Sequence, residues 1–169
     1  MVLAFAFSAG SARHSSTTNR TPSSAAVTVA APPTPDRATQ RACLAVFEKL
    51  PVQLGGLDPR KTDTNSSYVA AWGDPPVVLR CGVAKPSALN SADAPQPVDV
   101  NGVLWQPVPT KTTVVFTAVD RAAYIEVTVP TAQTQPLSDL SAAVKALPQV
   151  CTGTDAAGHT TDPALPACR

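Results

Sequence analysis

The chain has little of the chemistry on which most enzymes depend. It contains two histidines, His14 and His159, and two glutamates, Glu48 and Glu126. Neither histidine falls in a segment with helix or strand periodicity, so a histidine general base or a Ser-His-Asp triad has no rigid framework. The sequence also lacks the G-x-S-x-G, phosphate-loop and G-x-G-x-x-G motifs. We therefore assign no catalytic residue and expect no cofactor.

Charge and long apolar runs are also scarce. Charged residues make up 15% of the chain and the formal net charge is +1, whereas about a quarter of the residues are charged in a typical globular protein. Such a low and balanced charge offers no electrostatic footprint for nucleic acid or for an anionic membrane surface. The apolar run at residues 2–7 is far shorter than the roughly 20 residues of a transmembrane helix. We expect no nucleic-acid partner, and contact with a membrane only through an N-terminal anchor.

The first 35 residues are typical of an export and tether segment. The apolar run 2–7 is followed by small residues at 8–12, which resembles the end of a secretory signal peptide without its basic start. We interpret residues 1–12 as a truncated signal peptide or membrane anchor; the alternative is a terminus with chance apolar residues. Residues 13–35 are rich in Ser, Thr, Pro and Ala, and we expect a flexible tether because they offer little apolar surface to bury.

An even set of cysteines follows this leader: Cys43, Cys81, Cys151 and Cys168. This combination indicates disulfides formed in an oxidising compartment. Three pairings are possible, and we favour Cys43–Cys81 because both residues fall on apolar faces of predicted elements. Cys151–Cys168 would then close a polar tail at residues 151–169. Structural zinc sites prefer closely spaced Cys pairs, so we expect no metal.

Periodicity predicts one folded domain at residues 36–150. Asp36 is the expected N-cap of a helix at 37–49, and a second apolar stripe predicts a helix at 137–147. Residues 55–65 and 84–99 read as loops. The strands are expected at 67–72, 77–83, 103–108, 112–119 and 123–129. Short links between the last three predict an antiparallel meander. The expected fold is α+β: a two-layer sandwich with an antiparallel sheet of about four to five strands and two helices on one face.

Four residues are candidates for ligand contact: Trp72, Arg80, Trp105 and Arg121. Aromatic rings near guanidinium groups are suited to a shallow site for a sugar, a peptide or an anion. The alternative is structural, because most tryptophans pack in cores and an arginine on a strand can serve as an edge charge. For an enzyme, Asp74 or Asp120 would be the acid or base, although aspartate is common in turns for backbone reasons.

One segment carries a resemblance to a known family. The run at residues 70–83, AAWGDPPVVLRCGV, resembles an actinobacterial family known as domain of unknown function 3515, with support from NGVLW at 101–105 and DRAAYIEV at 120–127. The resemblance covers roughly residues 38 to 148. It implies an exported or membrane-anchored envelope protein and implies no particular activity.

Together these features predict a non-enzymatic extracytoplasmic domain, secreted or anchored to the outer face of the cell membrane. We expect it to bind an envelope protein or a cell-wall component. Two alternatives stay open: an enzyme that acts on a cell-envelope polymer, and a structural accessory domain without a ligand.

Overall fold

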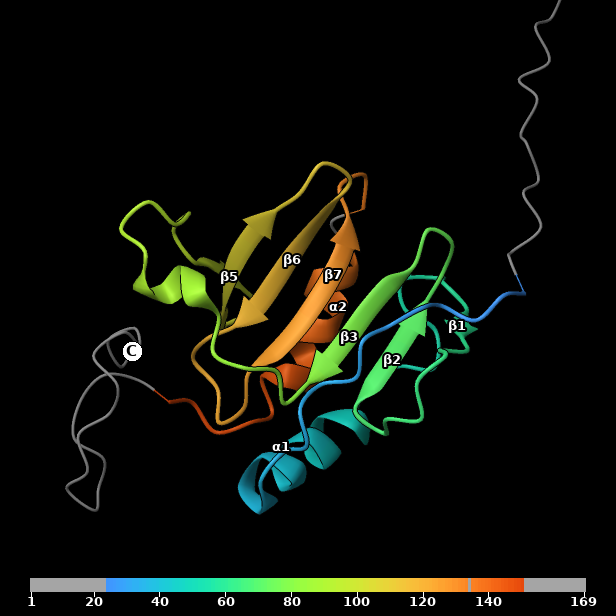
Figure 1. Cartoon of the computed structure of the whole chain (residues 1–169), viewed down its shortest axis with the longest axis horizontal. Helices are drawn as coiled ribbons and strands as arrows, with labels where there is room; N and C mark the ends of the chain where they lie inside the picture. The colour runs from blue at the N-terminus through green and yellow to red at the C-terminus, as the bar shows by residue number, and fades with distance from the viewer. Residues whose placement is uncertain (1–23, 134, 151–169) are drawn as a thin grey trace, which may run out of the picture.

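The computed structural model describes residues 24–133 and 135–150. Its strands form one sheet in the order β1-β2-β3-β7-β6-β5-β4, in which each strand runs antiparallel to its neighbours. Figure 1 shows α2 behind this sheet and α1 at its lower end. The elements are α1 (Arg37–Phe47), β1 (Pro59–Arg60), β2 (Val69–Trp72), β3 (Val77–Cys81), the 3-10 helix η1 (Ser87–Asn90), β4 (Val98–Val100), β5 (Val103–Pro109), β6 (Thr113–Ala118), β7 (Ile125–Pro130) and α2 (Gln135–Val144). The α+β class is confirmed, but the sheet has seven strands rather than four to five.

The two additional strands lie where the sequence predicts loops. β1 falls inside 55–65 and β4 overlaps the end of 84–99, and they contain only two and three residues. Strands of two or three residues are too short to show a detectable alternation of apolar and polar residues. Their place in the sheet is determined by the strands beside them. β4 joins β5 through Asn101-Gly102, both with positive φ (54° and 82°). Asn-Gly is a favoured hairpin turn, and it is the local signal from which this extra strand could have been predicted.

Both predicted helices are present. Asp36 caps α1, because its Oδ1 accepts a hydrogen bond of 2.7 Å from the Thr39 backbone N–H. This bond is the main reason that the pKa of Asp36 lies below its usual value of 3.8. In α2, the predicted stripe is buried, and Leu147 continues it beyond the last turn.

The sheet buries one face under both helices. Alternate residues of β3 and β7 point to this inner face, and they join side chains of α1 and α2 in a single apolar cluster. The inner residues of these two strands are at most 2% exposed: Val77, Leu79, Cys81, Ile125, Val127 and Val129. The alternation predicted for 77–83 and 123–129 is therefore confirmed.

A disulfide fastens the helical layer to the sheet. Cys43 of α1 is bonded to Cys81 of β3, with a Cα–Cα distance of 5.6 Å, and both residues are fully buried. The favoured pairing of these two cysteines is confirmed. The predicted pair Cys151–Cys168 lies outside the described residues.

Residues 24–36 form an N-terminal strap that follows the folded domain. At one end, Val27 donates a hydrogen bond to the Lys61 carbonyl (2.8 Å) and accepts one from the Asp63 N–H (3.1 Å). Figure 1 shows the strap passing in front of β2 and β3, on the side away from α2. At the other end Pro35 packs so closely that a methyl group on Gly82 would lie 3.4 Å from its Cβ.

The sequence predicts a flexible tether at 13–35, and the part of it that the structure describes, 24–35, makes contacts with the domain. Its contacts come largely from the main chain, including a 2.7 Å hydrogen bond from Arg60 Nη2 to the Ala25 carbonyl. A composition argument counts apolar side chains and does not detect such bonds. Pro32 is nevertheless buried, so a proline can also contribute packing here.

Candidate functional site

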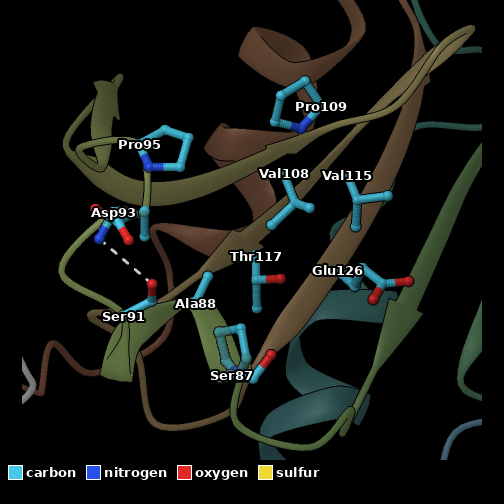
Figure 2. A pocket seen from close by; sticks show the side chains of 12 residues that line it. Ser87, Ala88, Ser91, Asp93, Pro95, Val108, Pro109, Val115, Thr117 and Glu126 are labelled. Atoms are coloured by element: carbon cyan, nitrogen blue, oxygen red, sulfur yellow. Dashed lines mark hydrogen bonds between the residues drawn. The ribbon is translucent and has the colours of Figure 1, made fainter.

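The face of the sheet opposite the helices carries a groove, seen from close by in Figure 2. It lies between the η1 connection and strands β5, β6 and β7, with a volume of about 540 Å³. This volume is in the range of small-ligand sites. We call it the outer groove. It is lined by Pro86, Ser87, Ala88, Ser91, Asp93, Ala94, Pro95, Val108, Pro109, Val115, Thr117 and Glu126.

The floor of the outer groove is built from outward-facing strand residues. Val108 of β5 lies opposite Val115 of β6, and Thr117 of β6 lies opposite Glu126 of β7. Val108 is 40% exposed and Thr117 only 4% exposed. The floor is thus apolar at one end, and at the other end it carries a hydroxyl beside a carboxylate.

The wall of the outer groove is the connection between β3 and β4. One polar side chain holds it against the sheet: Gln106 Nε2 donates to the Pro95 carbonyl at 2.7 Å and to the Pro107 carbonyl at 3.3 Å. Gln106 is 2% exposed, so this fastening is shielded from water. Pro86 and Pro95 restrict the backbone on either side of η1. The wall is therefore a constrained surface.

The ionisable residues that line the outer groove are both acidic. They are Asp93, which is exposed on the wall, and Glu126 on the floor. Glu126 Oε1 accepts a 3.2 Å hydrogen bond from Arg80 Nη1, and these two side chains are 21% and 25% exposed. Arg80 lies beside Glu126 on the neighbouring strand and is not among the lining residues. The groove and Arg80 together carry one net negative charge.

The outer groove offers contacts for binding but no nucleophile activated by a base. Among the described residues that line it there is no histidine, cysteine or lysine. Its two serines and one threonine would need a base within hydrogen-bond reach to act as nucleophiles. The arrangement is therefore suited to holding a ligand.

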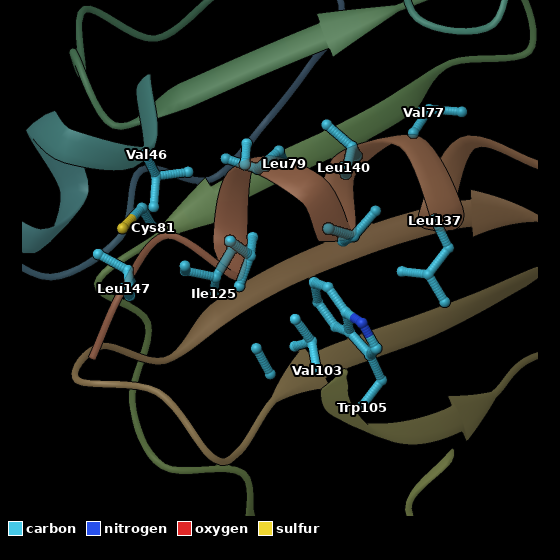
Figure 3. Packing of buried hydrophobic residues seen from close by; sticks show 14 of the residues in the cluster. Val46, Val77, Leu79, Cys81, Val103, Trp105, Ile125, Leu137, Leu140 and Leu147 are labelled. Atoms are coloured by element: carbon cyan, nitrogen blue, oxygen red, sulfur yellow. The ribbon is translucent and has the colours of Figure 1, made fainter. Parts of the chain in front are cut away.

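The two candidate tryptophans lie elsewhere. Trp105 is fully buried on the inner face, and its Nε1 donates to Ser141 Oγ of α2 at 3.0 Å. Figure 3 shows its ring within the cluster beneath α2. Trp72 is 3% exposed, and its Nε1 donates to the Val52 carbonyl at 3.2 Å. Both indoles are thus buried and each has a structural hydrogen-bond partner.

Arg121 belongs to a buried polar cluster with Asp120. Its Nη1 donates to Asp120 Oδ2 at 2.7 Å, and its Nη2 donates to the Gly102 carbonyl. Asp120 Oδ1 accepts from the Leu104 N–H at 3.0 Å, and Oδ2 also accepts from Gln149 Nε2 at 3.3 Å. This cluster ties the β4–β5 turn to the connection after β6.

Asp120 and Asp74, the candidates for an acid or base in an enzyme, both have a structural explanation. Asp120 is 1% exposed, so its carboxylate is shielded from a substrate by the same cluster. Asp74 lies in the turn between β2 and β3, after Gly73. A side chain on Gly73 would meet Leu57 at 3.0 Å, and its φ is +73°. The turn therefore requires glycine for a steric reason, and the neighbouring aspartate suits a turn.

The structure does not bring the four candidate residues together. Trp72 and Trp105 are in the core and Arg121 is in the polar cluster, whereas Arg80 is connected to the outer groove through Glu126. The sequence analysis missed the residues of the groove itself. The signal that points to it is the long proline-containing connection after β3, because long loops in compact domains are often functional.

Comparison with known proteins identifies a family without an assigned activity. A family model described as "Protein of unknown function (DUF3515)" matches residues 1–151. No curated protein and no solved structure is similar enough to count as a match. Within the described residues, no helix has the length and apolar character needed to cross a membrane. The match spans most of the sequence, and the chain belongs to the DUF3515 family.

Proposed function

We propose that this protein is a non-catalytic binding domain exported to the cell envelope, where the outer groove engages a partner protein or a cell-wall component. The observation that carries the proposal is the groove itself. It combines a floor that is apolar at one end, a constrained wall and two carboxylates, and its described lining offers no nucleophile paired with a base. Such concave, mostly apolar surfaces with a few placed polar groups are typical ligand sites.

The proposed compartment rests on sulfur chemistry. The Cys43–Cys81 bond is buried between α1 and β3, and disulfides of this kind form and persist mainly in oxidising compartments. The proposal includes an N-terminal signal or anchor at residues 1–12 and an actinobacterial envelope as the setting. Secretion and anchoring to the outer face of the membrane are both compatible with it.

Filling the outer groove tests the proposed function. Ala88 lines the groove, and Figure 2 shows its side chain directed toward Thr117. An Ala88→Trp variant places an indole in the groove, whereas Leu44→Trp adds the same residue to the exposed surface of α1, where Leu44 is 53% exposed. The measurement is binding of the oxidised full-length protein to actinobacterial wall and membrane preparations, after thermal unfolding shows that both variants are folded.

The expected result is a loss of binding, about tenfold or more, for Ala88→Trp and unchanged binding for Leu44→Trp. Equal binding by the wild type and Ala88→Trp would refute the groove as the binding surface. Absence of binding by the wild-type protein to every envelope preparation would favour a structural accessory domain without a ligand.

A further inference from the structure

We propose that the outer groove recognises an extended peptide segment through a lysine side chain, whose aliphatic stem lies on the floor and whose ammonium group meets Glu126. This inference rests on the proposed function, because it assumes that the groove is a binding site, and it specifies the chemistry of the ligand. It is carried by the charge of the lining, the apolar floor and the blocked edge of β5.

The charge of the lining selects a cation. Asp93 and Glu126 face the groove from opposite sides, as Figure 2 shows, and no basic residue is among the described lining residues. In the described part of the chain, Arg80 bonds to Glu126 through one carboxylate oxygen, Oε1. The second oxygen is available to a ligand. One monovalent cation would balance the single net negative charge of Asp93, Glu126 and Arg80.

The floor selects a cation with an apolar stem. Val108 and Val115 form an apolar pair across β5 and β6, next to the pair formed by Thr117 and Glu126. A lysine side chain matches this arrangement, because its methylene groups can pack on the apolar pair while its ammonium group binds the polar pair. The ammonium has three donors, which match the free carboxylate oxygen of Glu126 and a hydroxyl oxygen.

Thr117 supplies that hydroxyl. It is 4% exposed, and its oxygen is directed toward Glu126 in Figure 2. A hydroxyl oxygen beside a carboxylate can accept one of the three ammonium protons while the carboxylate accepts another. A compact ammonium suits this position because the planar guanidinium of Arg80 already occupies the other side of Glu126.

The edge of the sheet favours recognition through side chains over strand addition. β4 pairs with β5 only as far as Trp105, so Gln106 to Pro109 form an open edge. Pro107 and Pro109 are paired with β6, and neither has a backbone N–H to offer an added strand. Prolines on an edge prevent pairing with another chain. A peptide in the groove is therefore held mainly by its side chains.

The experiment compares three blocked pentapeptides that differ only at the central position. The sequence is Ala-Pro-X-Pro-Ala with acetylated and amidated ends, and X is lysine, norleucine or glutamate. Norleucine keeps the aliphatic stem and lacks the charge. Each peptide is titrated into the ¹⁵N-labelled, oxidised full chain, and the backbone amide shifts of Ala88, Val108, Val115 and Thr117 report on the groove.

The lysine peptide should shift these four amides in a saturable way, with an affinity about fivefold above that of the norleucine peptide. The glutamate peptide should bind more weakly still. High salt should reduce the lysine advantage, because the Debye length falls to about 3 Å at 1 M. Asp93→Asn, on an exposed loop, should weaken the lysine peptide about twofold and leave the norleucine peptide unchanged.

Two variants complete the test. Glu126→Gln should remove most of the lysine advantage, whereas Glu48→Gln, an equal charge change at the exposed end of α1, should leave it intact. Equal affinities for lysine and norleucine at the groove would overturn the lysine inference and leave the proposed function standing. If the lysine peptide shifts no groove amide, this ligand class is refuted, and binding of Ala88→Trp to envelope preparations then decides the proposed function separately.

Discussion

The two faces of the sheet are made from the same strands but differ in their side chains and in what covers them. On the inner face, alternate residues of β3 and β7 are buried under two helices and are almost uniformly apolar. On the outer face, the positions between them form mixed rows, such as Arg80, Glu126 and Thr117 across β3, β7 and β6. The inner face is determined by packing between elements, whereas the outer face is determined by which connections cover it.

The outer face is covered unevenly. The N-terminal strap passes over β2 and β3, the η1 connection forms a wall beside β5 and β6, and the outer groove lies along that wall. Under the proposed function, this difference separates stability from binding in the molecule. Substitutions on the inner face should cost stability, and substitutions in the outer groove should chiefly alter contacts with a ligand.

The largest effect is expected at the centre of the inner face. Trp105→Ala removes a fully buried indole and its hydrogen bond to Ser141, and it should lower the free energy of unfolding by about 3–5 kcal/mol. Val108→Ala, three residues along the same strand but on the outer face, should change it by about 0.5 kcal/mol. Urea unfolding followed by circular dichroism measures both. Similar losses in the two variants would remove the contrast between the faces.

Removing the Cys43–Cys81 disulfide should cause the next largest loss of stability. Cys43 and Cys81 are separated by 38 positions, for which the chain-entropy model gives a contribution of about 4 kcal/mol. The double variant Cys43→Ala with Cys81→Ala should approach this loss in urea unfolding. Replacing Cys151 and Cys168 instead leaves the Cys43–Cys81 link closed, and so provides the comparison. A double variant at 43 and 81 as stable as the wild type would show that the link adds nothing to the packing of α1.

Neighbouring residues of β7 sharpen the comparison within one strand. Val127 is fully buried on the inner face, and Val127→Ala should cost about 2–3 kcal/mol through lost burial and the remaining cavity. Thr128 is half-buried on the outer face, and Thr128→Ala should cost less than about 1 kcal/mol. Thermal and urea unfolding of the two single variants provide the test, and a larger loss for Thr128→Ala would contradict it.

The smallest effect on stability is expected at the start of α1, where the carboxylate of Asp36 caps the helix. The hydrogen bond from the Thr39 N–H lowers the pKa of Asp36 in the folded protein. Asp36 therefore stabilises the fold above its unfolded pKa, near 3.8, and this contribution is lost as the pH falls through the lower folded value. Asp36→Asn keeps a capping side chain without a charge.

The measurement is the free energy of unfolding of the wild type and Asp36→Asn from pH 7 to pH 2. The stability advantage of the wild type over Asp36→Asn should be present at neutral pH and should disappear in acid. A difference between the two proteins that stays constant over this range would show that the charge of Asp36 contributes nothing.

The inner face could be predicted from the sequence because its signals are local and repeated. Val77, Leu79 and Cys81 alternate, Asp36 precedes an apolar helical stripe, and these patterns place Cys43 and Cys81 on facing surfaces. The outer face lacks such signals. Val108, Thr117 and Asp93 become neighbours only after the meander has formed and Gln106 has fastened the η1 connection, so their juxtaposition follows from tertiary contacts.

The binding candidates show the same limit. Trp105 and Arg121 attract attention because of their residue types, yet a buried indole and a buried guanidinium each have structural partners here. Residue type alone does not say on which side of a strand, or at which depth, a side chain lies. Arg80 lies on the outer face, as the alternation of β3 predicts, and its ion-pair partner there is Glu126, which is distant in sequence.

The contacts of the strap determine which part of the domain would bear a pulling force on the N-terminus. It enters the body of the protein beside β1, at one end of the strand order, and the outer groove lies over β7, β6 and β5, between the middle of the sheet and its other end. With neighbouring strands about 4.8 Å apart, β6 lies roughly 20 Å from β1 across the sheet. If the protein is held by its N-terminus, the outer groove would therefore lie on the part of the sheet that is far from the point of attachment, where a ligand could reach it.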